Sequence, residues 1–489
     1  MNDLSDAVEQ LTQTVADLQR RVSALETSPP AAPHLLAQPA PFIPALPAAA
    51  SVPNAHESGV FSILGKAMLG IAGAYLLRAL AESSALPRLP VVALSIAYAF
   101  LWLVPAVRVS AKARLASVAW ACTSALILVP MLWELTLRFH TLPSAVTATI
   151  LCAFVIAASA LAWNHHFAEV VSVANAAASV AVLVLAIATR DLVPFIAALL
   201  LMAITGEVAA ARHRTLRVRP LVAACADLAL FALIWIYSSP AASSADYPAI
   251  GAALLLAFAP ALLLIYAASA SFQTILLRRR ISFFETAQVF LAALLSLWSV
   301  LVFWPGHGRL VLGVLCLFAS AAGYAATFAW LDRVHEQRNY HVYATGSLAL
   351  LLAGSFLCLP PGWLPLCLGI AAVASILIGT SRMRLTLQFH ALALLAASAF
   401  ASNLLVYIFH AMAGTFPGAP GPIFTLAGAC AMVSYAAVAR LRQETLPTRT
   451  LQLLFAALAV GFTTALLVWI LAMLTAMAAT PQAEHFAVL

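Results

Sequence analysis

Several polar side chains that exchange protons, bind ions or form hydrogen bonds lie inside long apolar segments of this chain. They are Asn175, Asp227, Glu285, Gln288, His390 and Lys66. A charged group at the centre of a bilayer costs at least about 2.5–3.5 kcal/mol, so each one needs a partner or a function. Carboxylates, amides and an imidazole in this setting are typical of a site that binds an ion, a proton or a polar head group.

The depth of these residues follows from the helical rise of about 1.5 Å per residue, counted from the nearest arginine cluster. Asp227 lies eight residues after Arg219, and Gln288 lies eight residues after Arg280. Nearer the arginines are Lys66, Glu207, Glu285 and His390, and Asn175 marks the deep edge. We therefore expect one polar layer in the cytoplasmic half of the membrane. Asp227 is its most deeply placed acid, with Lys66 or His390 as its partner.

In a second interpretation, each residue of this layer acts alone. The long side chains of Lys66, Glu207 and Glu285 lie close enough to the interface to reach water, and we favour this interpretation for them. A single buried histidine such as His390 is typical of a hydrogen-bonded packing residue. The short side chain of Asp227 leaves both interpretations open.

The elements that position these residues are membrane spans. Of the 489 residues, 64% are hydrophobic and 9% are charged, whereas soluble domains carry about 25% charged residues. A spanning helix needs about 20 apolar residues, and the sequence predicts an all-α polytopic integral membrane protein with about 15 (14–15) transmembrane helices. The predicted spans are 60–80, 88–107, 115–133, 143–163, 168–188, 191–210, 220–238, 248–268, 283–303, 310–331, 341–359, 363–380, 385–409, 422–439 and 451–474.

The basic residues between these spans predict the orientation of the chain. The loops after even-numbered spans hold 17 Lys and Arg residues, and the loops after odd-numbered spans hold four. Cytoplasmic loops carry such an excess, so we expect the N-terminus in the cytoplasm of a bacterial cell, with the chain in the inner (plasma) membrane. Fifteen spans place the C-terminus outside and fourteen place it inside. The least certain break is near His165, where the loop contains no arginine.

The segment before the spans predicts self-association. Residues 3–26 alternate valine and leucine in a heptad, and β-branched residues at a with leucine at d favour parallel dimers. We expect a cytoplasmic coiled coil over 1–28 that forms a homodimer or oligomer. A surface-bound amphipathic helix is the alternative, but its excess of acids opposes binding to anionic lipid. A Pro/Ala-rich linker over 29–58, a transmembrane domain over 59–475 and a tail over 476–489 follow.

Composition and motifs disfavour several functions. The chain contains neither H-E-x-x-H nor G-x-S-x-G, and none of its seven cysteines forms a C-x-x-C pair. We therefore expect no catalytic residue, metal or cofactor, and an enzyme is the less favoured class. Because the arginines lie in short loops, the expected partner is the lipid bilayer rather than nucleic acid.

Two functions remain. A transporter or flippase of a small or lipid-like substrate is favoured by the polar layer and by Pro260, the one proline well inside a predicted span. Its cavity is expected near Asp227. The alternative is a non-catalytic scaffold that recruits itself or a partner through the coiled coil.

The first span has features of its own. Within LGKAMLGIAGAYLLRALAESSALPRLP, the residues Gly65, Gly70 and Gly73 favour close helix contact, and Arg78 is expected to pair with Glu82. This segment, with a basic residue before a polar turn, resembles the start of the membrane region in a family of bacterial predicted membrane proteins of unknown function. The resemblance implies an N-terminal coiled coil and a proline-rich linker before many spans. It implies no activity, and members of that family are usually longer.

Overall fold

The computed structural model describes residues 16, 19, 55–82, 88–108, 114–165, 168–212, 216–239, 246–329, 337–413, 421–440 and 446–477. The chain divides into two units, Met1–Gly59 and Val60–Leu489. The coiled coil and the linker expected over residues 1–58 lie almost wholly outside the described residues, and they stay predictions. Most of the tail over 476–489 lies outside them too.

Every regular element in the described residues is helical, as the composition predicted. The α-helices are α2 (Ala55–Glu82), α3 (Arg88–Leu101), α4 (Leu103–Arg108), α5 (Arg114–Trp133), α6 (Ser144–His165), α7 (Ala168–Thr189), α8 (Leu192–Ala211), α9 (Arg219–Ser238), α10 (Ala252–Ser271), α11 (Phe283–Phe303), α12 (His307–Ala329), α13 (Gln337–Cys358), α14 (Leu364–Ser381), α15 (Leu385–Ala401), α16 (Leu404–Met412), α17 (Pro422–Ala439) and α18 (Leu446–Met477). Two π-helical segments, η1 (Glu134–Arg138) and η2 (Phe272–Leu276), extend α5 and α10.

The helices are those of a multi-pass membrane protein. In the described part of the chain, 13 are long and apolar enough to cross a bilayer, or 14 if the bent pair α15–α16 counts as one span. The predicted total of about fifteen is reached only by adding α2, whose described apolar part, Leu64–Leu76, is shorter than a full span. The uncertain break near His165 is present, because α6 ends there and α7 begins at Ala168.

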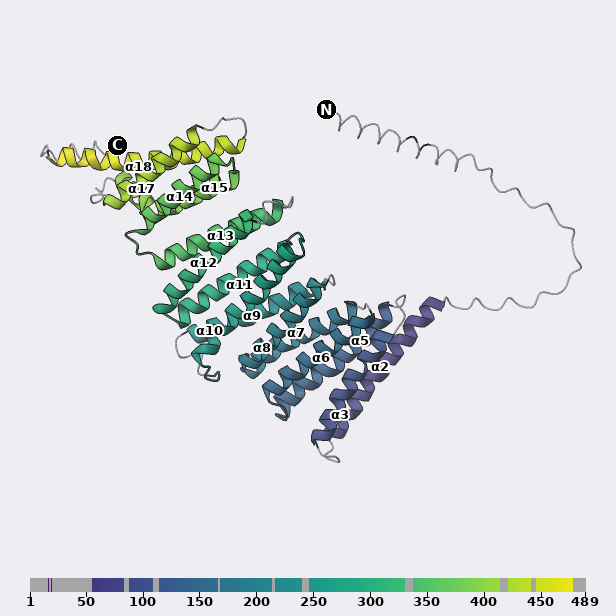
Figure 1. The fold of residues 1–489 in the computed structure, drawn as a ribbon. Coiled ribbons are helices and arrows are strands. Elements are labelled where there is room, and N and C mark those ends of the chain that lie inside the picture. The colour runs from purple at the N-terminus through teal and green to yellow at the C-terminus, as the bar shows by residue number, and fades with distance from the viewer. Residues whose placement is uncertain are drawn as a thin grey trace, which may run out of the picture. The chain divides into compact units, whose positions relative to one another are not determined.

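Helices of the second unit pack against their neighbours in chain order. Figure 1 shows that successive helices run in alternating directions. Many helices contact the next one in the chain, as in α6 with α7, α10 with α11 and α12 with α13, and several contact the next but one, as in α5 with α7, α6 with α8 and α9 with α11. A hairpin of two helices brings the end of one beside the start of the other. The end of α8 therefore lies beside the start of α9, and the end of α10 beside the start of α11.

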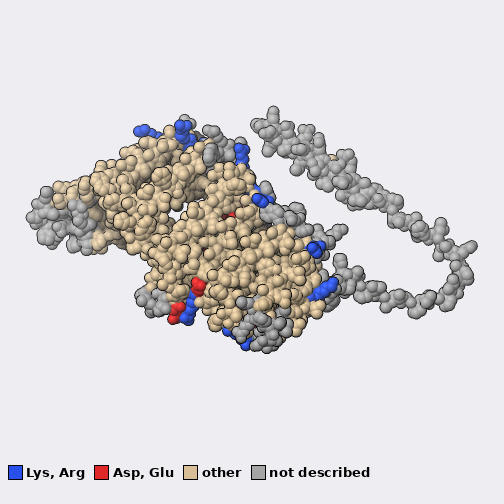
Figure 2. All heavy atoms as spheres, turned by 60° about the horizontal axis from the view of Figure 1, so that its bottom comes forward, with Lys and Arg blue, Asp and Glu red and all other residues tan. Residues whose placement is uncertain are grey.

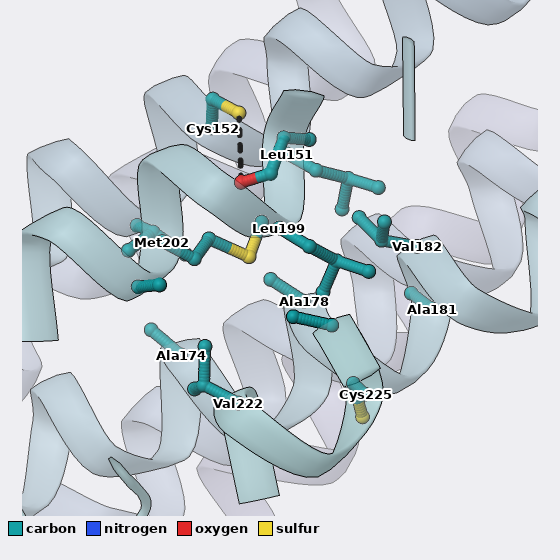
Figure 3. Close-up of a cluster of buried hydrophobic side chains, with 14 of the residues drawn as sticks. Leu151, Cys152, Ala174, Ala178, Ala181, Val182, Leu199, Met202, Val222 and Cys225 are labelled. Carbon is teal, nitrogen blue, oxygen red and sulfur yellow. Dashed lines mark hydrogen bonds between the residues drawn. The ribbon is translucent and has the colours of Figure 1, made fainter. Parts of the chain in front are cut away.

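The larger buried core is centred on α7, which contacts α5, α6, α8 and α9. Ala174 and Ala178 of α7 are fully buried, and small side chains let neighbouring helices approach closely. Leu151 of α6, Leu199 of α8 and Val222 of α9 fill the space around them (Figure 3). A second buried cluster joins α14, α15, α17 and α18.

Two helices differ from the predicted spans. The span expected over 385–409 is broken, because α15 and α16 meet at an angle of 51°, and Asn403 at the break has a positive φ of 59°, which asparagine tolerates better than most residues. Pro260 lies inside α10, but it is not the one interior proline. Pro130 also lies within a continuous helical segment, because η1 carries the span of α5 on to Arg138.

The surface of the helices is apolar. Leu69, Leu115 and Phe318 are 72%, 75% and 74% exposed. Exposed apolar side chains of this size are suited to contact with lipid and not with water. In Figure 2 the Lys and Arg side chains lie at the margins of the visible face, and a broad uncharged surface separates them. This distribution is compatible with helices that cross a bilayer.

Candidate functional site

Two of the expected residues meet between α9 and α11. Gln288 Nε2 donates a hydrogen bond to Asp227 Oδ1 at 2.9 Å, and the two residues are 5% and 7% exposed. The expectation that Lys66 or His390 is the partner of Asp227 is wrong. A neighbouring helix at the same depth supplies an amide instead of a charge.

A second polar group, the Arg219 cluster, consists of Glu207, Arg219, Ser269, Gln273 and Glu285. The Arg219 guanidinium donates to both carboxylate oxygens of Glu207, from Nε at 3.0 Å and from Nη2 at 2.7 Å. Its Nη2 also lies 3.5 Å from Glu285 Oε1. The Ser269 hydroxyl donates to Glu207 Oε2 at 2.6 Å, and Gln273 Nε2 donates to Ser269 Oγ at 3.0 Å. The cluster thus joins α8, α9, α10, η2 and α11.

Local sequence explains these positions. Glu207 lies near the end of α8 and Arg219 begins α9, so the hairpin turn brings them together. Ser282 precedes α11 and forms a capping box with Glu285, because its hydroxyl accepts from the Glu285 N–H and the Glu285 carboxylate accepts from the Ser282 N–H. The capping box holds the Glu285 carboxylate in the first turn, on the side of Arg219.

The carboxylates of Glu207 and Glu285 therefore do not extend to water. These residues are 6% and 8% exposed, and the expectation that they extend to the interface is wrong, because Arg219 pairs with both inside the protein. The ion pairs and hydrogen bonds of the Arg219 cluster tie these helices together.

The space beside this network is small. A cavity of about 10 Å³ is lined by Asn175, Glu207, Arg219 and Tyr266, among others, and it has room for about one water molecule. Asn175 Nδ2 donates to the Val171 carbonyl at 2.9 Å. Its Oδ1 is buried without a hydrogen-bond partner in the described part of the chain. This cavity is too small for a polar head group.

The remaining expected residues lie elsewhere. The Lys66 side chain is exposed on α2. His390 of α15 is 3% exposed, and its Nδ1 forms a hydrogen bond with the Tyr324 hydroxyl of α12 at 2.9 Å. In the described contacts, the partner of Asp227 is Gln288 and the partner of His390 is Tyr324, so the structure does not pair Asp227 with His390.

A much larger cavity, the Arg78 pocket, lies between α2, α3 and α5 with η1. Its volume is about 420 Å³. Apolar wall residues include Ile71, Val92, Leu126 and Met131. The helices from α5 to α8 run in alternating directions (Figure 1), so the C-terminal ends of α5 and α8 lie at opposite ends of these helices. The pocket lies at the end of α5, away from the Arg219 cluster.

One rim of this pocket is charged. Arg78 Nη1 lies 2.8 Å from Glu134 Oε1, and Arg138 also lines the cavity. The hydroxyl groups of two wall residues form hydrogen bonds within the protein. Tyr98 donates to the Gly70 carbonyl at 3.1 Å, and Ser95 donates to the Val91 carbonyl at 2.8 Å. The pocket is thus amphipathic, with a charged rim above an apolar wall.

The sequence pointed to part of this site. Arg78 was expected to pair with Glu82, whose side chain lies outside the described residues, and the structure pairs it with Glu134. The predicted span ended at residue 133 and left Glu134 and Arg138 in a loop. Pro130, Glu134 and Arg138 follow one another at intervals of four residues, and this spacing is the signal for a helix that continues past residue 133. π-Helical segments are frequent at functional sites.

In the described residues, no group of three or more His, Cys, Asp or Glu side chains is arranged to hold a metal ion. Comparisons of the chain with protein-family models, with curated proteins and with solved structures find no match.

Proposed function

We propose that this multi-pass membrane protein binds a lipid-like amphiphile in the Arg78 pocket and transfers it within or across the membrane, as a transporter or flippase. The observation that supports this function is the cavity of about 420 Å³ with a charged rim and an apolar wall. Ligand pockets commonly enclose about 300–1,000 Å³. A small hydrated ion has no use for an apolar wall, whereas an amphiphile matches both parts.

The pocket replaces Asp227 as the expected place of substrate binding. The cavity described beside the Arg219 cluster has a volume of about 10 Å³, so Asp227 and Gln288 do not hold the substrate in this proposal. Asp227 keeps a role as a proton acceptor that drives the transfer. Under that role, Asp227→Asn abolishes proton-coupled translocation in vesicles while substrate binding persists. Unchanged translocation by the variant removes Asp227 from the proposal.

Binding is tested by filling the pocket. Ala74 of α2 lines the cavity, and Ala74→Trp places an indole inside it. We expect labelling by a photoactivatable single-chain amphiphile to fall about tenfold, because steric exclusion is an effective barrier to binding. Ala72 lies on the same helix and is exposed, so Ala72→Trp is the matched control.

The readout is the labelled fraction of purified protein, with labelled peptides identified by mass spectrometry. Equal labelling of wild type and Ala74→Trp, or labelling confined to peptides outside α2, α3 and α5, contradicts the proposal. Co-elution of both variants with wild type on gel filtration excludes misfolding as the cause of a loss.

A further inference from the structure

The apolar wall of the Arg78 pocket has a defined depth. On α2 the wall extends from Arg78 to Ile71, and on α5 it extends from Glu134 to Leu126. The ion pair between Arg78 and Glu134, at 2.8 Å, marks the rim. These stretches of seven and eight residues correspond to roughly 10 and 12 Å, because an α-helix rises by about 1.5 Å per residue. The wall below the ion pair is therefore about 10–12 Å deep.

The inner end of the pocket is closed where α2, α3 and α5 converge. The floor consists of Gly70, Trp102 and Thr123, each within about one helical turn beyond the deepest wall residue of its own helix. A Cβ at Gly70 would lie 2.6 Å from the Trp102 ring and 3.1 Å from the Thr123 methyl group. Carbon atoms in contact are about 3.5–4.0 Å apart, so a methylene chain cannot pass between these residues.

One side of the pocket faces the bilayer. Tyr75 of α2 and Leu126 of α5 line the cavity and are 63% and 60% exposed. The back wall is buried, because Val92 of α3 and Ile127 of α5 are 6% and 4% exposed. An apolar chain can thus enter from the lipid at the exposed side without crossing water.

From this depth, floor and volume we infer that the pocket selects a single-chain amphiphile by the length of its chain. Carbon–carbon bonds of about 1.5 Å advance an extended chain by roughly 1.25 Å each, so the wall accommodates about eight to ten carbons. The volume of about 420 Å³ holds on the order of a dozen groups of the size of water or methylene, which leaves no room for a second chain.

This inference rests on the proposed function and adds the substrate class. The ligand is an amphiphile with one unbranched chain of about eight to ten carbons below its polar group. The end of such a chain lies at the floor. A longer chain is stopped there and has to turn out into the bilayer.

Ile71 is the deepest wall residue of α2, and its side chain should set the limit on length. Ile71→Ala removes three carbon atoms beside the floor and should raise the best chain length by about two carbons. Ile71→Trp should lower it by a similar amount. Leu69 lies on the same helix and is 72% exposed, so Leu69→Ala is the matched control and should leave the best length unchanged.

The test uses zwitterionic single-chain phosphocholines of increasing chain length, with a diazirine at the chain end. They label purified protein in a steroid-based detergent, which has no alkyl chain to compete, and mass spectrometry locates the labelled residues. Chains of about eight to ten carbons should label the peptides that contain Ile71 or Tyr98. A chain of about sixteen carbons should label these peptides about tenfold less, because its end is excluded from the floor.

The outcomes distinguish a failure of the inference from a failure of the proposed function. If no chain length labels peptides of α2, α3 or α5, the proposed function fails. If these peptides are labelled equally at every length, or the Ile71 variants keep the wild-type profile, only the inference of length selection fails. A best length that moves in opposite directions in Ile71→Ala and Ile71→Trp, and stays in Leu69→Ala, supports it. Co-elution with wild type on gel filtration shows that the variants are folded.

Discussion

Arg219 has a different role in the structure from the one that its place in the sequence suggests. In the sequence it belongs to a cluster of basic residues in a loop, and it served as a reference for depth. In the fold it is 9% exposed and lies between the carboxylates of Glu207 and Glu285. It also lies over the Phe284 ring, at 5.3 Å from the ring centre. A buried arginine with two acids is a structural tie, and removal of one partner leaves unpaired charge.

Replacement of Arg219 should therefore destabilise the protein. For Arg219→Gln we expect a loss of about 3–5 kcal/mol, because two buried carboxylates lose their cation. Arg217 lies two residues away and is exposed, so Arg217→Gln should cost less than about 0.5 kcal/mol. Denaturant unfolding in detergent micelles measures both. Equal stability of the two variants would contradict a structural role for the Arg219 cluster.

Asp227 provides a prediction about hydrogen bonding. The oxygen of an asparagine can accept the same hydrogen bond from Gln288, so Asp227→Asn should change stability by less than about 1 kcal/mol. Asp227→Leu leaves the buried Gln288 amide without its acceptor and should cost about 1–3 kcal/mol. Thermal unfolding of the purified variants distinguishes them. A leucine variant as stable as the asparagine variant would show that water or another group satisfies Gln288.

At the scale of elements, α2 packs on the bundle through glycine. The Gly70 carbonyl accepts a hydrogen bond from Tyr98. A Cβ at Gly70 would lie 2.6 Å from the Trp102 ring and 3.1 Å from the Thr123 methyl group. The Trp102 ring stacks on Trp120 with centroids 5.1 Å apart, so it has little freedom to move. Close approach of this helix is what closes one side of the Arg78 pocket.

Gly70→Ala should therefore shift α2 and weaken the pocket. Overpacking of a tight contact costs about 1–3 kcal/mol, and amphiphile labelling should fall with it. Gly65 lies on the same helix, and a Cβ there meets nothing within 4 Å, so Gly65→Ala should leave stability and labelling unchanged. Parallel measurement of thermal unfolding and labelling checks both. An unaltered Gly70→Ala would mean that α2 does not depend on this contact.

At the scale of the whole molecule, the arginine bias predicts which side each loop faces. With the N-terminus in the cytoplasm, the turn between α13 and α14 faces outward and the turn between α14 and α15 faces inward. The Arg78 pocket then opens toward the outer side of the membrane, and the Arg219 cluster lies toward the cytoplasm.

Cysteine accessibility tests this orientation. In a chain without native cysteines, Gly362→Cys should react with a membrane-impermeant maleimide in spheroplasts, and Ser381→Cys should react only after lysis. Both positions are exposed in the structure. The reverse pattern would invert the orientation and the assigned side of the pocket.

Self-association through residues 3–26 stays a prediction, because that segment lies outside the described residues. Deletion of 1–28 should convert a dimer into a monomer by native mass measurement while the membrane domain still inserts. A monomer with and without the segment would remove the support for the coiled coil and for a scaffold function.

The sequence by itself determined the class of fold and the approximate boundaries of most apolar helices. These properties depend on local composition and on the length of apolar segments, and a bilayer enforces both. The break near His165, which no basic residue marks, is present too, because α6 ends at His165 and α7 begins at Ala168.

Only the tertiary structure decided the partners. Depth along one helix does not say which face points to which neighbour, so the pairing of Asp227 with Gln288 and of Glu207 with Arg219 needed the packing of α8 to α11. The Arg78 pocket depended on still more, because it exists only where α2, α3 and α5 meet and where η1 carries Glu134 and Arg138 past the expected helix end. Composition fixes where along the chain the apolar helices lie, and packing fixes what each side chain touches.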